Sequence, residues 1–227
     1  RWFAHQNSSY GLMQQVAWSV LQRLIALFKE HNISTIAVCC GQGNNAGDGY
    51  LLAKYLKLHG FTVDIYAAEL GASQDLQSAH KEAQEENIKI VSGFNFQEKY
   101  DCVVDALFGI GLTRELDEQW QNVISNINEH EALKVAIDIP SGLQANTGQP
   151  LPCAVKADYT FTVLALKAGL FTGKAKEYTG VIETISLIPK DSELHAVAQL
   201  APTNITLPTR KAFGHKGSYG HVLVVGG

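Results

Sequence analysis

The sequence lacks several patterns that would place the protein in a large class at once. It has no run of five basic residues, and its 18 Lys and Arg are outnumbered by 22 Asp and Glu, for a formal net charge of −4. No apolar stretch reaches the roughly 18 residues that a membrane span needs, and the opening RWFAHQNSS has no signal-peptide pattern. We therefore expect neither a nucleic acid nor a membrane as a partner.

Cysteine and histidine are too scattered for a zinc or redox centre. The four cysteines form no C-x-x-C pair, and no two of the eight histidines are spaced as H-x-x-x-H. Those spacings are typical of zinc and thiol chemistry. Three of the cysteines fall within apolar, strand-like runs, which favours reduced core cysteines in a cytoplasmic protein.

Helix-like and strand-like segments alternate along most of the chain. Apolar residues recur with the 3.6-residue period of an amphipathic helix over 9–30, with Ser8 or Ser9 as a possible N-cap. Further helices are predicted over 48–60, 73–87 and 117–130, and strands over 35–40, 61–68, 100–109, 133–142, 157–166 and 180–188. This alternation predicts an α/β fold, a Rossmann-like three-layer α/β/α sandwich with a mostly parallel central sheet.

The composition changes after Pro189. Residues 190–209 contain two prolines and little periodicity, which indicates a linker. A basic glycine-rich turn, a strand and a Gly-Gly pair follow over 210–227 and look like the opening of another α/β unit. We therefore expect one domain over 1–189, a linker over 190–209 and the truncated start of a second domain over 210–227. The chain has no initiator Met, so we expect it to be trimmed at its N-terminus.

Polar groups follow three predicted strands at their carboxyl ends, where ligands bind in open parallel sheets. They are Asn44, Asn45, Asp48, Asp105, Asp138 and Ser141. Burying a carboxylate costs several kcal/mol unless it is paired or binds a cation, and no Lys or Arg lies within three residues of Asp105 or Asp138. An inter-strand partner, a cation and a functional carboxylate therefore all stay open. Amide, carboxylate and hydroxyl oxygens suit a hard cation, which makes Asn45, Asp105 and Ser141 a candidate site.

The glycine-rich segment GQGNNAGD (41–48) is one residue longer than the dinucleotide fingerprint G-x-G-x-x-G and lacks the Lys-Ser/Thr of a P-loop. We place Asp48 in the first turn of the next helix, where it would repel a pyrophosphate bound to the same amides. The loop is therefore expected to face sugar hydroxyls or a nicotinamide-like group. Phosphates are expected at GIGLTR (109–114), where amides and Arg114 form an anion nest. Lys167 is a further candidate anion partner, or else a solvated loop lysine.

Four segments together resemble the NAD(P)H-hydrate epimerase family. They are GQGNNAGDGYLLAKYLKLHGF, VVDALFGIGLTR, VAIDIPSGL and TFTVLALKAGLFTGKAKEYTG, in this order over about residues 35–188. The tail RKAFGHKGSYGHVLVVGG is similar to the start of a ribokinase-like NAD(P)H-hydrate dehydratase domain that uses ADP or ATP. The resemblance implies the N-terminal part of a bifunctional repair enzyme, with ADP or ATP serving only the downstream domain.

The resemblance also implies a substrate and a role for each site residue. The substrate is hydrated NADH or NADPH (NADHX or NADPHX), whose R and S forms are interconverted without a redox cofactor. Asp138 is implied as the catalytic, substrate-contacting residue, and one K⁺ per subunit is implied at Asn45, Asp105 and Ser141. The other substrate contacts expected are Asn44, Asn45, Ala46, Gly47, Asp48, Gly109, Ile110, Gly111, Leu112, Thr113, Arg114, Glu115 and Lys167. A homodimer or higher homo-oligomer is implied as well.

Two residues depart from the family pattern. Ala46 replaces a frequent Gly, which is tolerated if its φ is negative. Trp18 stands where a small residue is expected, and its bulk would change dimer packing or close part of the pocket. The acidic N-terminal segment usual in the family is missing from this chain.

Two other function classes stay open. A Rossmann-type dehydrogenase needs an acidic residue at the end of the second strand, and the match is poor because Asp64 lies mid-strand and Glu69 just beyond it. A non-catalytic nucleotide- or protein-binding module on the same fold predicts loss of Asp138 or of the Asn44–Asn45 pair, and all three residues are present.

Overall fold

A computed structural model describes residues 8–96, 98–187, 196 and 198. The predicted linker, apart from residues 196 and 198, and the predicted start of a second domain lie outside the described residues. The helices are α1 (Ser9–His31), α2 (Asn44–Leu58), α3 (Gln74–Glu85) and α4 (Glu118–Glu129), with short 3-10 turns η2 (Ala168–Leu170) and η3 (Ala175–Glu177). The strands are β1 (Thr35–Cys40), β2 (Thr62–Ala67), β3 (Lys89–Ser92), β4 (Cys102–Ala106), β5 (Leu133–Ile137), β6 (Tyr159–Val163) and β7 (Val181–Ile185).

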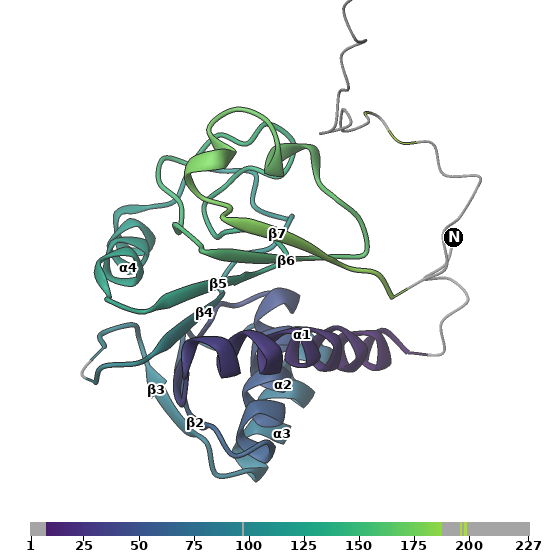
Figure 1. The fold of residues 1–227 in the computed structure, drawn as a ribbon, viewed down its shortest axis with the longest axis vertical. Coiled ribbons are helices and arrows are strands. Elements are labelled where there is room, and N and C mark those ends of the chain that lie inside the picture. Colours follow the sequence, from purple (N-terminus) through teal and green to yellow (C-terminus); the bar gives the residue numbers. More distant parts are fainter. Residues whose placement is uncertain (1–7, 97, 188–195, 197, 199–227) are drawn as a thin grey trace, which may run out of the picture. The chain divides into compact units, whose positions relative to one another are not determined.

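The strands form one sheet in the order β3-β2-β1-β4-β5-β6-β7, and every neighbouring pair is parallel. Helices α1, α2 and α3 pack on one face of the sheet and α4 packs on the other (Figure 1). The predicted three-layer α/β/α architecture is confirmed, and the sheet is wholly rather than mostly parallel. Within the described part of the chain, no helix combines the length and apolarity that a bilayer crossing requires.

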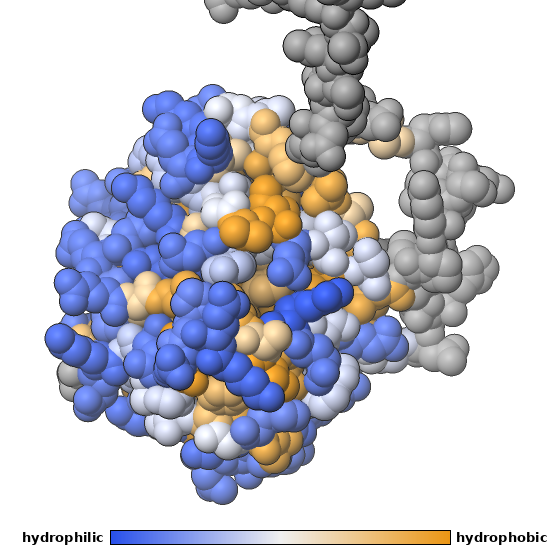
Figure 2. All heavy atoms as spheres, in the orientation of Figure 1, coloured by the Kyte–Doolittle hydropathy of each residue, from blue (hydrophilic) through white to orange (hydrophobic). Residues whose placement is uncertain are grey.

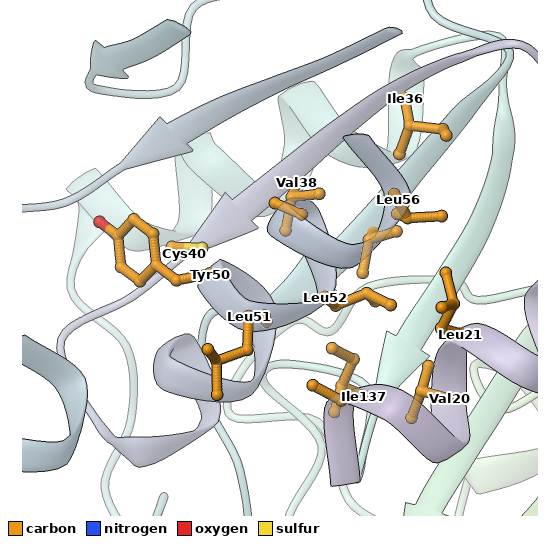
Figure 3. Packing of buried hydrophobic residues seen from close by; sticks show 14 of the residues in the cluster. Val20, Leu21, Ile36, Val38, Cys40, Tyr50, Leu51, Leu52, Leu56 and Ile137 are labelled. Atoms are coloured by element: carbon orange, nitrogen blue, oxygen red, sulfur yellow. The ribbon is translucent and has the colours of Figure 1, made fainter. Parts of the chain in front are cut away.

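The main core lies between the sheet and helices α1 and α2. Every residue of β1 from Ile36 to Cys40 is buried, because both faces of this central strand are covered. Figure 3 shows how side chains of both helices meet those of the sheet; the set includes Val20, Leu21, Ile36, Val38, Leu52, Leu56 and Ile137. This packing fixes the amino end of α2 beside the carboxyl ends of β1 and β4.

Several strands are shorter than predicted, and one strand was not predicted. Strand β3 is only four residues long and partly exposed at the sheet edge, so KIVS carries too little periodicity to be recognised. The strand predicted over 133–142 ends at Ile137, because Asp138 adopts a left-handed φ of 69°. Helix α1 agrees with its prediction, and its N-cap is Ser8, whose Oγ accepts a 3.2 Å hydrogen bond from the Gly11 amide.

Trp18 lies on the outer side of α1 and is 46% exposed. Its ring centroid is 5.6 Å from those of both Tyr55 and His59 on α2. Figure 2 shows apolar side chains interspersed among hydrophilic ones on the face of the molecule that it draws. Leu58 is a further exposed apolar residue. Trp18 does not line the cavity at the carboxyl end of the sheet, so the prediction that its bulk closes part of the pocket is wrong. Its effect on dimer packing stays a prediction.

Candidate active site

A cavity of about 880 Å³ lies over the carboxyl ends of the central strands. Its walls come from the first turns of α1 and α2, from the loops that follow β4, β5 and β6, and from Trp120 of α4. The cavity spans the position where the strand order reverses, between β1 and β4. This is where open parallel sheets bind their ligands, because the loops diverge there and leave a crevice.

Helix α2 begins at Asn44, four residues earlier than predicted. Gly43 is its N-cap and has extended backbone angles, with φ −103° and ψ −175° and no side-chain cap. Asp48 therefore lies in the second turn of the helix, and its predicted position in the first turn is wrong. The free amides of the first turn remain available for an anion, so the argument against a phosphate at this point no longer holds.

The glycines of this segment serve close packing. A Cβ on Gly41 would lie 2.0 Å from the Leu107 carbonyl oxygen, and one on Gly49 would lie 2.6 Å from the Ala106 Cβ. A Cβ on Gly47 would lie 2.5 Å from the Met13 sulfur. The absence of side chains at these glycines therefore lets the loop and α2 pack closely against α1, β4 and the residue that follows β4.

The same packing decides which loop residues reach the cavity. Asn44, Asn45 and Asp48 line the cavity, whereas Ala46 and Gly47 do not. Ala46 is fully buried in the core and is not among the residues with positive φ, so the predicted tolerance of a methyl group there is confirmed.

Asp138 lies on the cavity wall and is ion-paired with Lys167. The Lys167 ammonium donates to Asp138 Oδ1, to Thr162 Oγ1 at 2.9 Å and to the Val163 carbonyl at 2.7 Å. Its three protons are thus used inside the protein, so its anion partner is this carboxylate and the solvated-lysine alternative is wrong. Asp138 and Leu164 both have left-handed φ, 69° and 65°, a strain that costs about 1 kcal/mol or more at each position.

Asp48 is the second carboxyl group at this wall. Burial, and after it the charge of Asp138, raise the pKa of the Asp48 carboxyl well above its usual range. No described residue forms an ion pair with it. A carboxyl group with a raised pKa beside an ion-paired Asp138 is an arrangement suited to a site that gives a proton at one atom and takes one at another.

Asp105 and Ser141 are in direct contact, as predicted. Ser141 Oγ donates to Asp105 Oδ1 at 2.6 Å, and the Ser141 amide donates to Oδ2 at 2.7 Å. Burial outweighs these hydrogen bonds and raises the pKa of Asp105 to about 6. Asn45 is bonded to neither residue; its Nδ2 donates to the Ile137 carbonyl at 3.3 Å.

The surroundings of Asp105 fit a hard cation. Asp105 is 1% exposed, its donors are all uncharged, and no described Lys, Arg or His forms an ion pair with it. A buried carboxylate without a counter-charge is costly, and oxygen ligands are those that alkali and alkaline-earth cations prefer. Among the described residues no group of three or more His, Cys, Asp or Glu could hold a metal ion, so a site here depends on Ser and Asn oxygens as well.

The loop after β4 forms one wall of the cavity. All seven residues from Gly109 to Glu115 line the cavity. The Arg114 side chain is exposed and pairs with no carboxylate in the described part of the chain. Within the same part, the amides of Ile110, Gly111 and Arg114 donate to no other residue. These groups are free to bind phosphate oxygens.

The family profile described as "YjeF-related protein N-terminus" matches residues 9–169. The chain belongs to this family. The match begins at the first residue of α1 and ends within η2, so it includes every residue of the cavity wall described above.

Individual relatives agree with this membership. The chain is 36% identical to the bifunctional NAD(P)H-hydrate repair enzyme Nnr of Coxiella burnetii over 236 residues, which cover 97% of this chain and 46% of that protein. It is 34% identical to the NAD(P)H-hydrate epimerase of Levilactobacillus brevis over 207 residues, 86% of this chain and 94% of that protein. The chain thus spans less than half of the bifunctional relative. The crystal structure of yeast ynu0 (YNL200c) has a TM-score of 0.70 at 19% identity and covers 81% of this chain and 82% of its own, which supports the fold.

Sequence reasoning missed the apolar part of this YjeF-related site. Met13 and Val16 of α1, Phe108 and Trp120 line the cavity, and the rings of Phe108 and Trp120 are 4.7 Å apart. Met13 and Val16 belonged to a stripe that we assigned to the core or an interface, and both are indeed buried. Because both residues lie in the first turns of α1, they contact the core and also face the cavity. The 3.6-residue spacing of apolar residues shows only that they are buried.

Proposed function

We propose that this chain is an NAD(P)H-hydrate epimerase domain, which interconverts the R and S forms of NADHX and NADPHX. The observation that carries the proposal is the pair of carboxyl groups, Asp138 held by Lys167 and the raised-pKa Asp48, in a cavity at the switch point of the sheet. The name of the Levilactobacillus brevis relative, which the chain matches over 94% of its length, supports the same activity.

The reaction needs proton transfer and no net oxidation. In the hydrated nicotinamide, C6 bears a hydroxyl group and is bonded to the ring nitrogen. The nitrogen lone pair forms a C=N bond as the C6–O bond breaks, and the leaving hydroxyl takes a proton and departs as water. Water then adds to either face of the iminium carbon and gives up a proton. The protein must supply one proton and recover one, which an acid/base carboxylate does. Asp138 is the residue we assign to this role.

The remaining wall residues bind and orient the substrate. We assign the amides of Ile110, Gly111 and Arg114 and the Arg114 side chain to the pyrophosphate. Asn44, Asn45 and Asp48, which line the same cavity, are assigned to the nicotinamide ring and its ribose. Potassium is the cation that we propose for Asn45, Asp105 and Ser141, one ion per subunit. When bound, it supplies positive charge beside the buried Asp105 carboxylate and stabilises the turn that carries Ser141.

The proposal also covers the order of domains along the chain. We propose that residues 1–189 form the epimerase domain and that 190–209 link it to a dehydratase domain beginning at 210–227, which uses ADP or ATP. The bifunctional relatives of Coxiella burnetii and Escherichia coli, of which the matched region covers 46% and 38%, support this arrangement. A cytoplasmic homodimer or higher homo-oligomer completes the proposal.

An assay on a mixture of R- and S-NADHX tests the activity. An S-specific dehydratase with its nucleotide is added in excess, with this chain present or absent, and loss of each form is followed. We expect the R form to disappear with the wild-type chain and to persist with Asp138→Asn. The matched control is Asp158→Asn, an exposed carboxylate outside the cavity that accepts a 2.7 Å hydrogen bond from the Lys134 amide. Persistence of R-NADHX with a folded, nucleotide-binding wild-type chain would overturn the proposal in favour of a binding module.

A further inference from the structure

A second hollow, of about 300 Å³, adjoins the main cavity on the side of β2 and β3. Its lining includes Gln42, Glu69, Ser92, Phe94 and Trp120. Gln42 and Trp120 line both spaces, so the hollow lies next to the main cavity. No residue assigned above to the reaction or to the cation lies in it.

The hollow lies where the second half of a dinucleotide would reach. The groups assigned to the nicotinamide half follow β1 and β5, and those assigned to the pyrophosphate follow β4, whereas the hollow lies at the ends of β2 and β3. Dinucleotides bind across the switch point of such a sheet, one half on each side. Two and a half strand spacings of about 4.8 Å, about 12 Å in all, separate the midpoint of β2 and β3 from β4, whose following loop is assigned to the pyrophosphate.

The walls of the hollow suit a flat, uncharged base. The Phe94 and Trp120 rings are tilted by 52° with centroids 5.7 Å apart, and both side chains are partly exposed. A Cβ built on Gly93 would meet no atom within 4 Å, so this side of the hollow is open. Aromatic faces bind nucleobases by stacking, whichever base is offered.

Glu69 is the only charged residue among the described residues that line the hollow. It is exposed and lies two residues after Ala67, the last residue of β2. A carboxylate in this region accepts hydrogen bonds from the ribose 2′-hydroxyl, whereas a 2′-phosphate requires a cationic partner. No Lys or Arg of the described chain lines the hollow.

We propose that this hollow binds the adenosine half of the substrate and that Glu69 makes the protein prefer NADHX over NADPHX. The proposal rests on the proposed function, since it assigns the other end of the same dinucleotide. The 2′-phosphate of NADPHX carries a charge between −1 and −2 at neutral pH, and the Glu69 carboxylate repels it.

The ratio of kcat/KM for NADHX and NADPHX tests Glu69. One carboxylate at a solvent-exposed site is expected to favour NADHX by about three- to tenfold. Glu69→Gln should bring the ratio close to one, and Glu69→Lys should reverse it. The control is Glu30→Gln, an exposed glutamate near the end of α1 and outside both spaces, which should leave the ratio unchanged. An equal wild-type preference, or a ratio that Glu69→Gln does not alter, overturns the role of Glu69.

Filling the hollow tests the adenosine site itself. Ser92 is exposed at the end of β3, and Ser92→Trp places a large ring in the hollow. We expect KM for NADHX to rise about tenfold, with no change for hydrated nicotinamide mononucleotide, which has no adenosine. An equal change for both substrates, or for neither, overturns the assignment.

Binding of AMP, measured by calorimetry on the same proteins, needs no turnover. AMP should bind the wild-type chain more tightly than it binds Ser92→Trp, and more tightly than adenosine 2′,5′-bisphosphate binds the wild-type chain. If the wild type fails to epimerise NADHX yet shows this pattern, the proposed function is wrong and the subsite stands. Absence of AMP binding, or AMP binding that Ser92→Trp leaves intact, overturns the subsite.

Discussion

The Asp105 carboxyl links the free energy of unfolding to pH and to potassium. Burial raises its pKa from 3.8 to about 6 in the folded protein. One pKa unit corresponds to about 1.36 kcal/mol, so this rise corresponds to about 3 kcal/mol. Because the folded value lies above the unfolded one, the stabilisation is fully present below about pH 3.8 and is lost as the pH rises through about 6.

In potassium-free buffer, the wild-type protein should therefore lose about 3 kcal/mol of stability from this group between about pH 4 and pH 7. A cation bound beside the carboxylate favours its ionised form, so potassium should reduce that loss. At a concentration 100 times its dissociation constant, the ion contributes about 2.7 kcal/mol. The expected stabilisation by potassium is accordingly large near pH 7.5 and small near pH 4.5.

Urea unfolding followed by circular dichroism, in potassium chloride and in choline chloride of equal ionic strength, measures both effects. Asp105→Asn is the matched variant. It should be less stable than wild type near pH 4.5, because its single amide oxygen cannot accept from both the Ser141 and the Leu107 amides, which donate to different oxygens of Asp105. Near pH 7.5 without potassium this difference should shrink or reverse, because the neutral amide has no ionisation cost. Its pH slope should be shallower and its potassium effect absent. Equal slopes, or equal stabilisation of both proteins by potassium, would refute the reasoning.

Three further results are expected. Asp48→Asn should gain stability relative to wild type at pH 8 but not at pH 5 in denaturant titrations, because its raised pKa makes ionisation of Asp48 unfavourable; a pH-independent difference would contradict this. Lys167→Met should lower kcat about 100-fold with a smaller change in KM, and wild-type kcat would exclude a role for the ion pair. Gly49→Ala should lose about 1–3 kcal/mol from the 2.6 Å Cβ contact, whereas Gly111→Ala, with nothing within 4 Å, should lose almost none.

The layers of the fold and part of the site follow directly from the sequence. The strand over 35–40 is apolar and buried from Ile36 to Cys40 because helices cover both faces of the sheet there. Asp105 and Ser141 meet as predicted because the carboxyl ends of parallel neighbours β4 and β5 share one edge. Such contacts depend only on which strands are neighbours and on how they are aligned. The alternation of helices and strands along the sequence leaves few possibilities for either.

Other features depend on packing that a single sequence does not encode locally. The partner of Asp138 is Lys167, 29 residues away, and only the turn after β6 brings the two together. The start of α2 was predicted too late because Gly43 and Asn44 are residue types common in turns. In the structure Gly43 is the N-cap and the helix begins at Asn44. The roles of Gly41 and Gly49 became evident only from the atoms that oppose their missing Cβ.

The left-handed backbone at Leu164 has a consequence for protein engineering. Leucine rarely adopts a φ of 65°, so Leu164→Gly would release strain of about 1 kcal/mol. A library screened for thermal tolerance would therefore enrich this substitution. The same change would loosen the segment between Val163 and Lys167, whose contacts aim the ammonium group at Asp138. Selection for thermal stability alone is therefore expected to yield a more stable domain with a lower kcat, because the residues with strained backbone lie beside the residues assigned to the reaction.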